Sequence, residues 1–291
     1  MRLSKYHGLG NDFLLVEDSD CRQSGWDLPG LARQLCDRHY GVGADGLVPM
    51  AAGRDGADCQ VRIFNSDGSE AEISGNGVRC AAAQWFRTRK TGSAEVRIGT
   101  AAGVKKLELL EQDGNTSYFA SWMGQPRFRP EEIPMRVPEP LDEVLDYALP
   151  VEGSTVRLTA ASMGNPHCSI FVDAIDDGEI ERVGKLLENH SVFPQKTNVE
   201  FIRVVEPGKI RVWFWERGVG RTLSSGTGSC GSALAAIRNG HAADRVRVVT
   251  DSGSMQVTWR PGQSVRLEGP AELVCDVEVY LPSQTLCWIR E

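Results

Sequence analysis

The sequence predicts a globular α+β protein built from two copies of one unit, and three observations lead to this fold class. Short β-rich runs punctuated by glycine dominate the chain, with helical segments between them. Gly10-Asn11 precedes an apolar strand, and Gly164-Asn165 does so again 154 residues later. Ser74-Gly-Asn-Gly77 opens one alanine-rich helix, and Ser225-Gly-Thr-Gly228 opens another after 151 residues. Such near-equal spacing indicates an internal duplication.

Composition and charge exclude several classes of protein. The chain has 291 residues, enough for about two domains of roughly 150 residues each. With 41% hydrophobic and 24% charged residues, it is neither disordered nor fibrous. No apolar run reaches the ~20 residues of a membrane helix, and the N-terminus lacks the apolar core of a secretory signal. The net charge of −7, without a basic cluster, indicates neither a nucleic-acid nor a membrane partner. We therefore expect a cytoplasmic protein that binds a small molecule or another protein.

The eight cysteines and five histidines form no metal-binding pattern. Neither a Cys-x-x-Cys nor a His-x-x-x-His motif occurs, and the cysteines are scattered along the chain. In a chain of this length without a secretory signal, such cysteines are typically reduced and buried. We expect no metal site, no disulfide framework and no cofactor.

The elements of the first half follow from apolar periodicity. A helix is predicted over Leu28–Arg38, because its apolar residues recur with the i, i+3, i+4, i+7 spacing of an amphipathic helix. The alanine-rich segment Asn76–Arg87 predicts a second helix. Strands are expected where apolar or alternating segments lie between turn residues, at Phe13–Val16, Cys59–Asn65, Ala94–Arg97, Val104–Leu110 and Thr116–Trp122.

The second half repeats this succession of elements. A helix is predicted over Ile180–Asn189, and the glycine-rich loop Gly218–Gly228 leads into another that ends near Gly240, because glycine suits a helix C-cap. Strands are expected at Val156–Ala160, Ser169–Val172, Glu200–Val205, Lys209–Trp215, Arg245–Thr250, Met255–Arg260, Val265–Gly269 and Val277–Leu281.

The proline-rich stretch Pro126–Pro140 is interpreted as the crossing between two domains. The order of the elements suggests that the last strand and the tail return to the first domain. We therefore expect an N-terminal domain of residues 1–125 plus 277–291 and a C-terminal domain of residues 126–276.

The two glycine-led helix starts predict a chemistry. A helix N-terminus offers unpaired N–H groups and about half a positive charge, and glycine there lets an anion approach closely. Two such ends facing each other across a domain cleft would clamp one carboxylate, with Ser74 and Ser225 immediately before the helices. A racemase without a cofactor needs this arrangement, because it places a base on one face of the substrate and an acid on the other. The alternative is that each serine is an ordinary N-cap. The symmetric pair favours the functional interpretation.

Five segments resemble the diaminopimelate epimerase family, and they lie in order from the first residues to the last strands. The segments are His7-Gly-Leu-Gly-Asn-Asp-Phe13, Phe64-Asn-Ser-Asp-Gly-Ser-Glu70, Gly75-Asn-Gly-Val-Arg-Cys80, Ser162-Met-Gly-Asn-Pro-His167 and Glu216-Arg-Gly-Val-Gly220. The resemblance implies two similar pseudo-symmetric α+β domains, each a mixed β-barrel-like sheet around a central helix. It also implies pyridoxal-independent interconversion of LL- and meso-diaminopimelate, on the route to lysine and the cell wall. Members of the family often form homodimers.

The resemblance also implies roles for individual residues. His167 and Glu216 match two residues that tune the catalytic pair. Arg217 is suited to hold the distal carboxylate of the substrate in a bidentate manner. The implied substrate-binding positions are Asn11, Asn65, Asn165, Asn198, Glu216 and Arg217, and the implied carboxylate clamp consists of the amides of Gly75, Asn76, Gly226 and Thr227.

The chain departs from the family at the two catalytic positions, where the resemblance implies cysteines and the sequence has Ser74 and Ser225. A hydroxyl is a weaker acid than a thiol by several pKa units, and each unit costs about 1.36 kcal/mol unless something compensates. Cys80 and Cys230 lie beyond the first helical turn, and we expect them in the core rather than as replacement bases.

Three explanations account for the two serines. In the first explanation, they are introduced substitutions that keep the shape of the site and remove two oxidisable thiols. Alternatively, they belong to a natural serine enzyme, in which His167 and Glu216 move the proton. In the third explanation the scaffold serves another purpose, as a racemase or isomerase of another amino acid or as a diaminopimelate-binding protein without catalysis.

Overall fold

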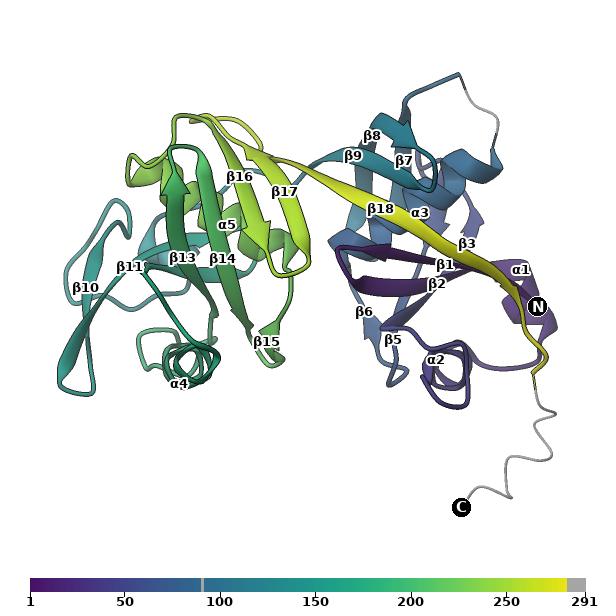
Figure 1. The fold of residues 1–291 in the computed structure, drawn as a ribbon, viewed down its shortest axis with the longest axis horizontal. Helices are drawn as coiled ribbons and strands as arrows, with labels where there is room; N and C mark the ends of the chain where they lie inside the picture. Colours follow the sequence, from purple (N-terminus) through teal and green to yellow (C-terminus); the bar gives the residue numbers. More distant parts are fainter. Residues whose placement is uncertain (90–91, 282–291) are drawn as a thin grey trace, which may run out of the picture. The chain divides into compact units, whose positions relative to one another are not determined.

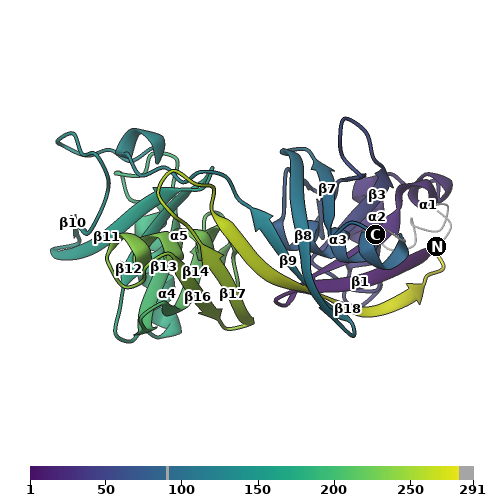
Figure 2. The same cartoon turned by 90° about the horizontal axis from the view of Figure 1, so that it is seen from above.

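The computed structural model describes residues 1–89 and 92–281, which form two compact units. Of the described residues, unit 1 comprises Met1–Ser121 together with residues 270–281, and unit 2 comprises Trp122–Gly269. Each unit is a ring of mixed parallel and antiparallel strands around one central helix (Figures 1 and 2). This architecture confirms the predicted fold class.

The ring of unit 1 closes on itself. Its strands pair in the order β18, β1, β2, β3, β4, β7, β8, β9 and back to β18. The strands are β1 (Arg2–Gly8), β2 (Asn11–Glu17), β3 (Gly46–Ala52), β4 (Cys59–Val61), β5 (Ile63–Asn65), β6 (Glu70–Ala71), β7 (Glu95–Thr100), β8 (Gly103–Asp113), β9 (Thr116–Trp122) and β18 (Arg266–Glu278). The helices are α1 (Asp18–Gln23), α2 (Leu28–Cys36) and the central α3 (Gly75–Thr88).

Unit 2 repeats the plan. Its strands pair in the order β18, β17, β16, β14, β13, β12, β11, and residues 123–127 close the ring by bonding to Val265 and Ser162. The strands are β10 (Tyr147–Val151), β11 (Ser154–Ser162), β12 (Pro166–Phe171), β13 (Asn198–Glu206), β14 (Lys209–Glu216), β15 (Gly220–Thr222), β16 (Arg245–Thr250) and β17 (Gly253–Thr258). The helices are the 3₁₀ turn η1 (Pro130–Glu132), α4 (Asp177–Glu188) and the central α5 (Gly226–Arg238).

The pairing register makes the duplication explicit. β2 pairs with β3 in parallel, with Phe13 opposite Gly46, and β12 pairs with β13 in parallel, with His167 opposite Asn198. The parallel pairs β4–β7 and β14–β16 also correspond. Because parallel neighbours need a crossover, a helix lies between the strands of each pair, and in the second pair it is the central helix. Equivalent positions in the two units can therefore be assigned residue by residue.

The central helices are closely enclosed because most of their buried side chains, Arg79 excepted, are small. Residues 77–83 of α3 and residues 228–236 of α5 are buried without interruption. A helix buried on all sides shows no amphipathic stripe, and alanine, glycine, serine and cysteine let the strands approach it closely. In Figures 1 and 2, α3 and α5 each lie among the strands of their own unit.

Several sequence expectations need correction. The strand β3 and the short helix α1 were not predicted, and the expected strand Cys59–Asn65 is divided into β4 and β5. The segment expected as a strand at Val265–Gly269 belongs largely to β18, whereas only Val277 and Glu278 of the expected strand Val277–Leu281 lie in β18. A fully apolar run such as that of β3 shows no alternation, because both faces of a parallel strand are covered.

The unit boundaries differ from the expected domain limits. Residues from Trp122 belong to unit 2, because Met123 already bonds to Val265. The proline-rich stretch therefore lies within unit 2, where Ile133 is fully buried. β18 pairs with β17 up to Glu268 and with β1 from Glu272, so the chain returns to unit 1 at Pro270 rather than at residue 277. Of the expected tail, residues 282–291 lie outside the described part of the chain.

Candidate active site

Both serines predicted as catalytic lie at the start of a central helix. Ser74 and Ser225 have the extended backbone of N-cap residues, with φ of −132° and −143°. Ser74 Oγ accepts a hydrogen bond from the Gly77 amide at 3.1 Å, and Ser225 Oγ accepts one from the Gly228 amide at 3.2 Å. The N-cap interpretation therefore holds at both positions, and it leaves the preceding amides of each first turn available to an anion.

A Cβ could be added at the first residue of each central helix without a clash. A Cβ built on Gly75 would have Arg79 Nη1 at 3.9 Å as its nearest neighbour, and one built on Gly226 would have Leu267 Cδ2 at 3.7 Å. By contrast, a Cβ on Gly228 would approach the Phe214 ring to 2.9 Å. The first glycine therefore leaves room for a ligand, whereas Gly228 permits close packing.

In unit 1, two predicted asparagines meet beside α3. Asn76 Nδ2 donates to Asn11 Oδ1 at 3.2 Å, and Asn11 Nδ2 donates to Asp45 Oδ2 at 2.7 Å. Asn65 pairs with Gly46 across β3 and β5 and donates to Ser69 from its side chain. Asp45, which was not predicted, thus fixes the orientation of the Asn11 side-chain amide. A carboxylate can only accept hydrogen bonds, so the Nδ2 group of Asn11 must face it.

A charged cluster lies next to these asparagines of unit 1 and fixes their surroundings. Asp12 accepts two hydrogen bonds from Arg38 and one from the Asp45 amide, and it forms an ion pair with Lys5 at 2.9 Å. Burial alone would raise the pKa of Asp12, but Arg38 and Lys5 outweigh it and hold the pKa below its usual value. The cluster keeps Asp12 ionised and ties the end of the 41–46 loop to β2.

A buried arginine lies in the first turns of α3. Arg79 is 1% exposed, and its guanidinium donates to Asn76 and, through Nε, to the carbonyl of Pro270 at 3.2 Å. Its charge adds to that of the helix N-terminus, so the start of α3 is positive. Sequence analysis did not single out Arg79, although an arginine inside an alanine-rich helix is the signal that marks it.

In unit 2, Ser225 contacts a carboxylate. Ser225 is 6% exposed, and its hydroxyl donates to Glu216 Oε2 at 3.0 Å. Glu216 ends β14, and Ser225 precedes α5, so the short hairpin through β15 brings the two together. A hydroxyl with a carboxylate acceptor is oriented for proton transfer.

Next to this pair, a chain of hydrogen bonds leads from the centre of unit 2 to the start of α5. Thr227 Oγ1 accepts from Asn165 Nδ2 at 3.4 Å, and Asn165 Oδ1 lies 2.9 Å from His167 Nε2. His167 Nδ1 lies 2.6 Å from Glu200 Oε1. Burial raises the pKa of Glu200, and the neighbouring His167 opposes that shift.

Asn198 and Arg217 belong to the same set of residues in unit 2. Asn198 Nδ2 donates to the Pro166 carbonyl at 2.8 Å, and its Oδ1 accepts from the Arg217 amide at 3.0 Å. The Arg217 side chain is exposed and donates to the Gln195 carbonyl at 3.1 Å. Asn198 therefore holds the backbone from which the Arg217 guanidinium extends.

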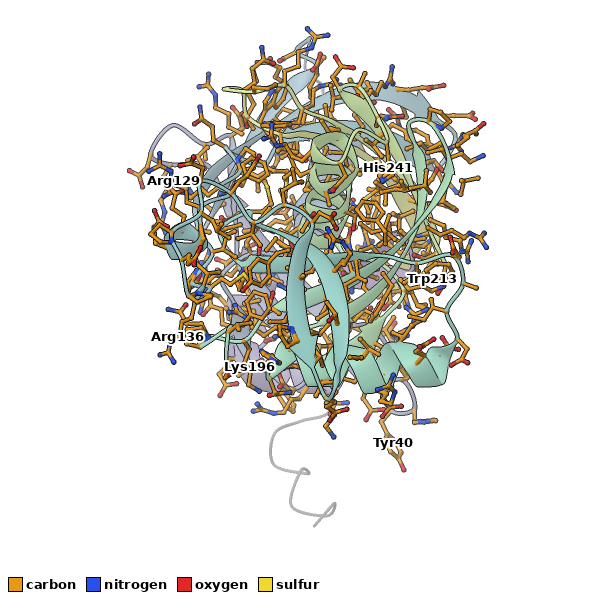
Figure 3. The ribbon with its side chains drawn as sticks, turned by 90° about the vertical axis from the view of Figure 1, so that its left-hand side faces the viewer. Tyr40, Arg129, Arg136, Lys196, Trp213 and His241 are labelled. Atoms are coloured by element: carbon orange, nitrogen blue, oxygen red, sulfur yellow. The ribbon has the colours of Figure 1, made fainter. Side chains whose placement is uncertain are left out.

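Glu188 anchors Gly218, which follows Arg217 in the turn between β14 and β15. Its carboxylate accepts from the Gly218 amide at 3.0 Å and from Trp215 Nε1 at 2.8 Å, and it forms an ion pair with Lys196 at 3.5 Å. Lys196 is among the side chains labelled in Figure 3. These contacts limit the movement of the turn that presents Arg217.

The structure thus gathers the predicted residues into two sets, one in each unit. It argues against His167 as a proton carrier, because the side chain is fully buried and both ring nitrogens are engaged. Cys80 and Cys230 are also fully buried, and burial raises the pKa of Cys80 to about 12, so neither replaces a catalytic base. Of the seven described cysteines, six are buried and Cys275 is exposed.

The two sets of residues contain the asparagines, the glycine-led helix starts and the Glu216-Arg217 turn that the resemblance implied. The model of the family described as diaminopimelate epimerase matches residues 3–129 and 159–274. The chain belongs to the diaminopimelate epimerase family. It is 44% identical over 274 residues to the diaminopimelate epimerase of Pelotomaculum thermopropionicum, across 94% of this chain and 97% of that protein. The diaminopimelate epimerase of Synechocystis sp. is 41% identical over 275 residues, across 94% of this chain and 97% of that protein.

Solved structures with low sequence identity share the fold of this diaminopimelate epimerase family member. A PhzF-family phenazine biosynthesis protein from Bacillus anthracis superposes with a TM-score of 0.66 at 17% identity, covering 97% of this chain and 99% of that one. A hydroxyproline epimerase from Agrobacterium vitis gives a TM-score of 0.58 at 17% identity, covering 96% and 90%. Across residues 1–89 and 92–281, no helix is long and apolar enough to cross a membrane, and no three His, Cys, Asp or Glu side chains are grouped to hold a metal ion.

Proposed function

We propose that this protein is a cofactor-independent epimerase that interconverts LL- and meso-diaminopimelate, with Ser74 and Ser225 in the acid and base positions. The observation that supports this most strongly is the duplicated helix start. Each unit has a serine N-cap followed by a glycine at which an added Cβ would meet no atom closer than 3.7 Å. Membership of the diaminopimelate epimerase family supplies the substrate.

In the proposed reaction, an oxygen on one face of the substrate takes the α-proton while a hydroxyl on the other face delivers one. The first-turn amides of α3 and α5 bind the α-carboxylate and stabilise the negative charge that develops as the proton leaves. When Ser225 acts as the base, Glu216 takes the hydroxyl proton at the same time as the serine oxygen takes the α-proton. Ser74 delivers its proton and is left as an alkoxide, and exchange with solvent removes the proton from Glu216 and returns one to Ser74 before the next turnover. Arg217 binds the distal carboxylate.

The serines support a second candidate function. Each lost pKa unit raises the barrier by about 1.36 kcal/mol, and the hydroxyl is several units weaker than a thiol. A protein that binds diaminopimelate without moving its proton would have the same asparagines, glycines and arginine. Activity toward another amino acid is the further alternative.

The test is α-hydrogen exchange in heavy water, followed by NMR with LL- and meso-diaminopimelate. We expect exchange above the protein-free control, lost when both serines become alanine. Because Ser225→Ala also removes a helix cap worth about 1 kcal/mol, the matched control is Asp176→Ala, which removes the cap on the Glu179 amide of α4 and should leave exchange intact.

Two other outcomes would assign the protein differently. Exchange that appears only after both serines are changed to cysteine identifies a binding site disarmed at its two catalytic positions. Binding of diaminopimelate by calorimetry, without exchange in either form, supports the binding protein. Absence of both overturns the substrate assignment.

We further propose that the enzyme acts in the cytoplasm on a free small molecule, without a nucleic-acid or membrane partner. The net charge of −7 and the absence of a basic cluster in the sequence support this. The homodimer remains a prediction from the family, which sedimentation of the purified protein would test.

A further inference from the structure

Glu200 is a buried carboxylate outside the set of residues that the family resemblance implies. It lies on β13, is 1% exposed, and accepts from Ser169 Oγ at 3.2 Å in addition to its contact with His167. A buried ionisable pair rarely stabilises a fold more than apolar side chains of similar size would. The buried pair of His167 and Glu200 therefore needs an explanation other than stability.

The duplicated unit supplies an internal comparison. His167 pairs with Asn198, and Ser169 pairs with Glu200, across β12 and β13. At the equivalent positions of β2 and β3, Phe13 pairs with Gly46, and Leu15 pairs with Val48. The apolar residues Phe13, Leu15 and Val48 are buried in the core of unit 1. The same architecture is thus built without a polar side chain at these positions, so the fold does not require Glu200, Ser169 or His167.

The contacts of His167 define which ring nitrogen holds a hydrogen. Asn165 Oδ1 is an acceptor, so His167 Nε2 must donate to it. Burial favours the protonated form of Glu200, which donates to His167 Nδ1 and so leaves the ring hydrogen on Nε2. An ionised Glu200 would instead accept a hydrogen from Nδ1. α5 holds the ring against this network, because a Cβ on Gly231 would come within 2.9 Å of His167 Cβ.

The two units orient their equivalent asparagines in opposite ways. Asn11 turns its oxygen toward Asn76 on α3, because Asp45 binds its NH₂ group. Asn165 turns its NH₂ group toward Thr227 on α5, because His167 binds its oxygen. A hydrogen-bond donor therefore faces the start of one central helix and an acceptor faces the start of the other.

We propose that Glu200 is a positioning residue, which keeps the hydrogen of His167 on Nε2 and thereby turns the NH₂ group of Asn165 toward the ligand-binding start of α5. The consequence for catalysis rests on the function proposed above. The orientation of His167 and Asn165 does not.

The experiment compares the wild type with three variants of the full chain by long-range ¹H–¹⁵N NMR of the histidine rings. Glu200→Val introduces the residue of unit 1, and Glu200→Gln retains a side chain that can donate to Nδ1. The double variant His167→Phe/Glu200→Val copies the buried pair of unit 1; it assigns the His167 signal by its loss and shows whether the apolar pair folds. We expect a single Nε2-protonated form in the wild type and in Glu200→Gln, and a second, Nδ1-protonated form in Glu200→Val. A single Nε2-protonated form in Glu200→Val would overturn the proposal.

Exchange of the α-hydrogen provides the functional readout. Glu200→Val should lower the exchange rate by about tenfold or more, as happens when a carboxylate that orients a metal-binding histidine is removed, and Glu200→Gln should retain most of the rate. If the wild type exchanges and Glu200→Val exchanges equally fast, the positioning role fails and the proposed function stands. If the wild type does not exchange, the proposed function fails, and the ring spectra still decide the role of Glu200.

Discussion

The residues next to Ser74 and Ser225 determine how each hydroxyl can replace the thiol that the family resemblance implies. Ser225 has Glu216 at 3.0 Å to accept its proton, whereas Ser74 lies beside a helix start made positive by Arg79. The two hydroxyls thus have different surroundings despite equivalent places in the duplicated unit. We expect unequal roles for them, with Ser225 the better base.

Arg217 offers the sharpest test of the substrate at this scale. Arg217→Ala should reduce diaminopimelate binding below detection in calorimetry, because it removes the cation proposed for the distal carboxylate. Arg203→Ala, which removes an exposed arginine near the Trp213 ring, is the matched control and should bind normally. Unchanged affinity in Arg217→Ala would leave the fold assignment but remove this contact.

Asp12 makes stability depend on pH. Its pKa is lowered in the folded protein, so its stabilising contribution is complete above the unfolded pKa of about 3.9 and is lost as pH falls through the folded value. Asp12→Asn should lower the free energy of unfolding by roughly 1–3 kcal/mol at pH 7, and the difference from wild type should shrink below pH 4. Urea unfolding at pH 7 and pH 3 measures this, with the exposed Asp113→Asn as control. A difference that is constant with pH would contradict it.

At the scale of the element, α5 combines a packing surface with a ligand site. Gly228 and Gly231 lie where a Cβ would press on Phe214 and His167, whereas a Cβ on Gly226 would make only ordinary contact with Leu267. The same glycine-rich sequence thus serves two purposes within two turns. The position of each glycine, rather than its presence, decides which purpose it serves.

Two alanine substitutions separate these purposes. Gly226→Ala should keep the unfolding free energy within about 1 kcal/mol of wild type, since alanine favours a helix, but should weaken diaminopimelate binding, because the methyl group occupies the anion's approach. Gly228→Ala should cost roughly 1–3 kcal/mol through overpacking against Phe214. Urea unfolding and calorimetry on both variants measure the contrast. Equal stability of the two would show that the packing argument is wrong.

At the scale of the whole molecule, β18 belongs to both units. It pairs with β17 in unit 2 and with β1 in unit 1, where Ala271 is fully buried in the core. Unit 2 is contiguous in sequence, whereas unit 1 needs a strand from the far end of the chain. The duplication is therefore symmetric in topology and asymmetric in connectivity.

This asymmetry predicts how fragments behave. Residues 122–269 contain every strand of the unit 2 ring and should unfold cooperatively in urea by themselves. Residues 1–121 lack the strand that closes their ring between β1 and β9, which leaves two unpaired edges. They should become cooperative only when residues 270–281 are supplied as a peptide. A cooperative transition of 1–121 alone would contradict this account.

Local patterns account for the elements that the sequence predicted well. The strands Thr116–Trp122 and Arg245–Thr250 have the predicted bounds, because alternation and flanking turns are written in adjacent residues. The two serine caps and their glycines were likewise identified from a short motif. β3 was missed because a parallel strand covered on both faces shows no alternation of apolar and polar residues. Glu200 was missed because, without such alternation, a carboxylate in a strand is read as a solvent-facing residue.

The sequence by itself determined the duplicated α+β unit, the central helices and the serines that begin them, because each depends on residues close together in the chain. The tertiary structure decided the closure of the unit 1 ring by β18 and the contact of His167 with Glu200, which lie 33 residues apart. These features depend on strand register and on which buried polar groups find a partner. Such pairings are set when the strands assemble, and no local pattern encodes them.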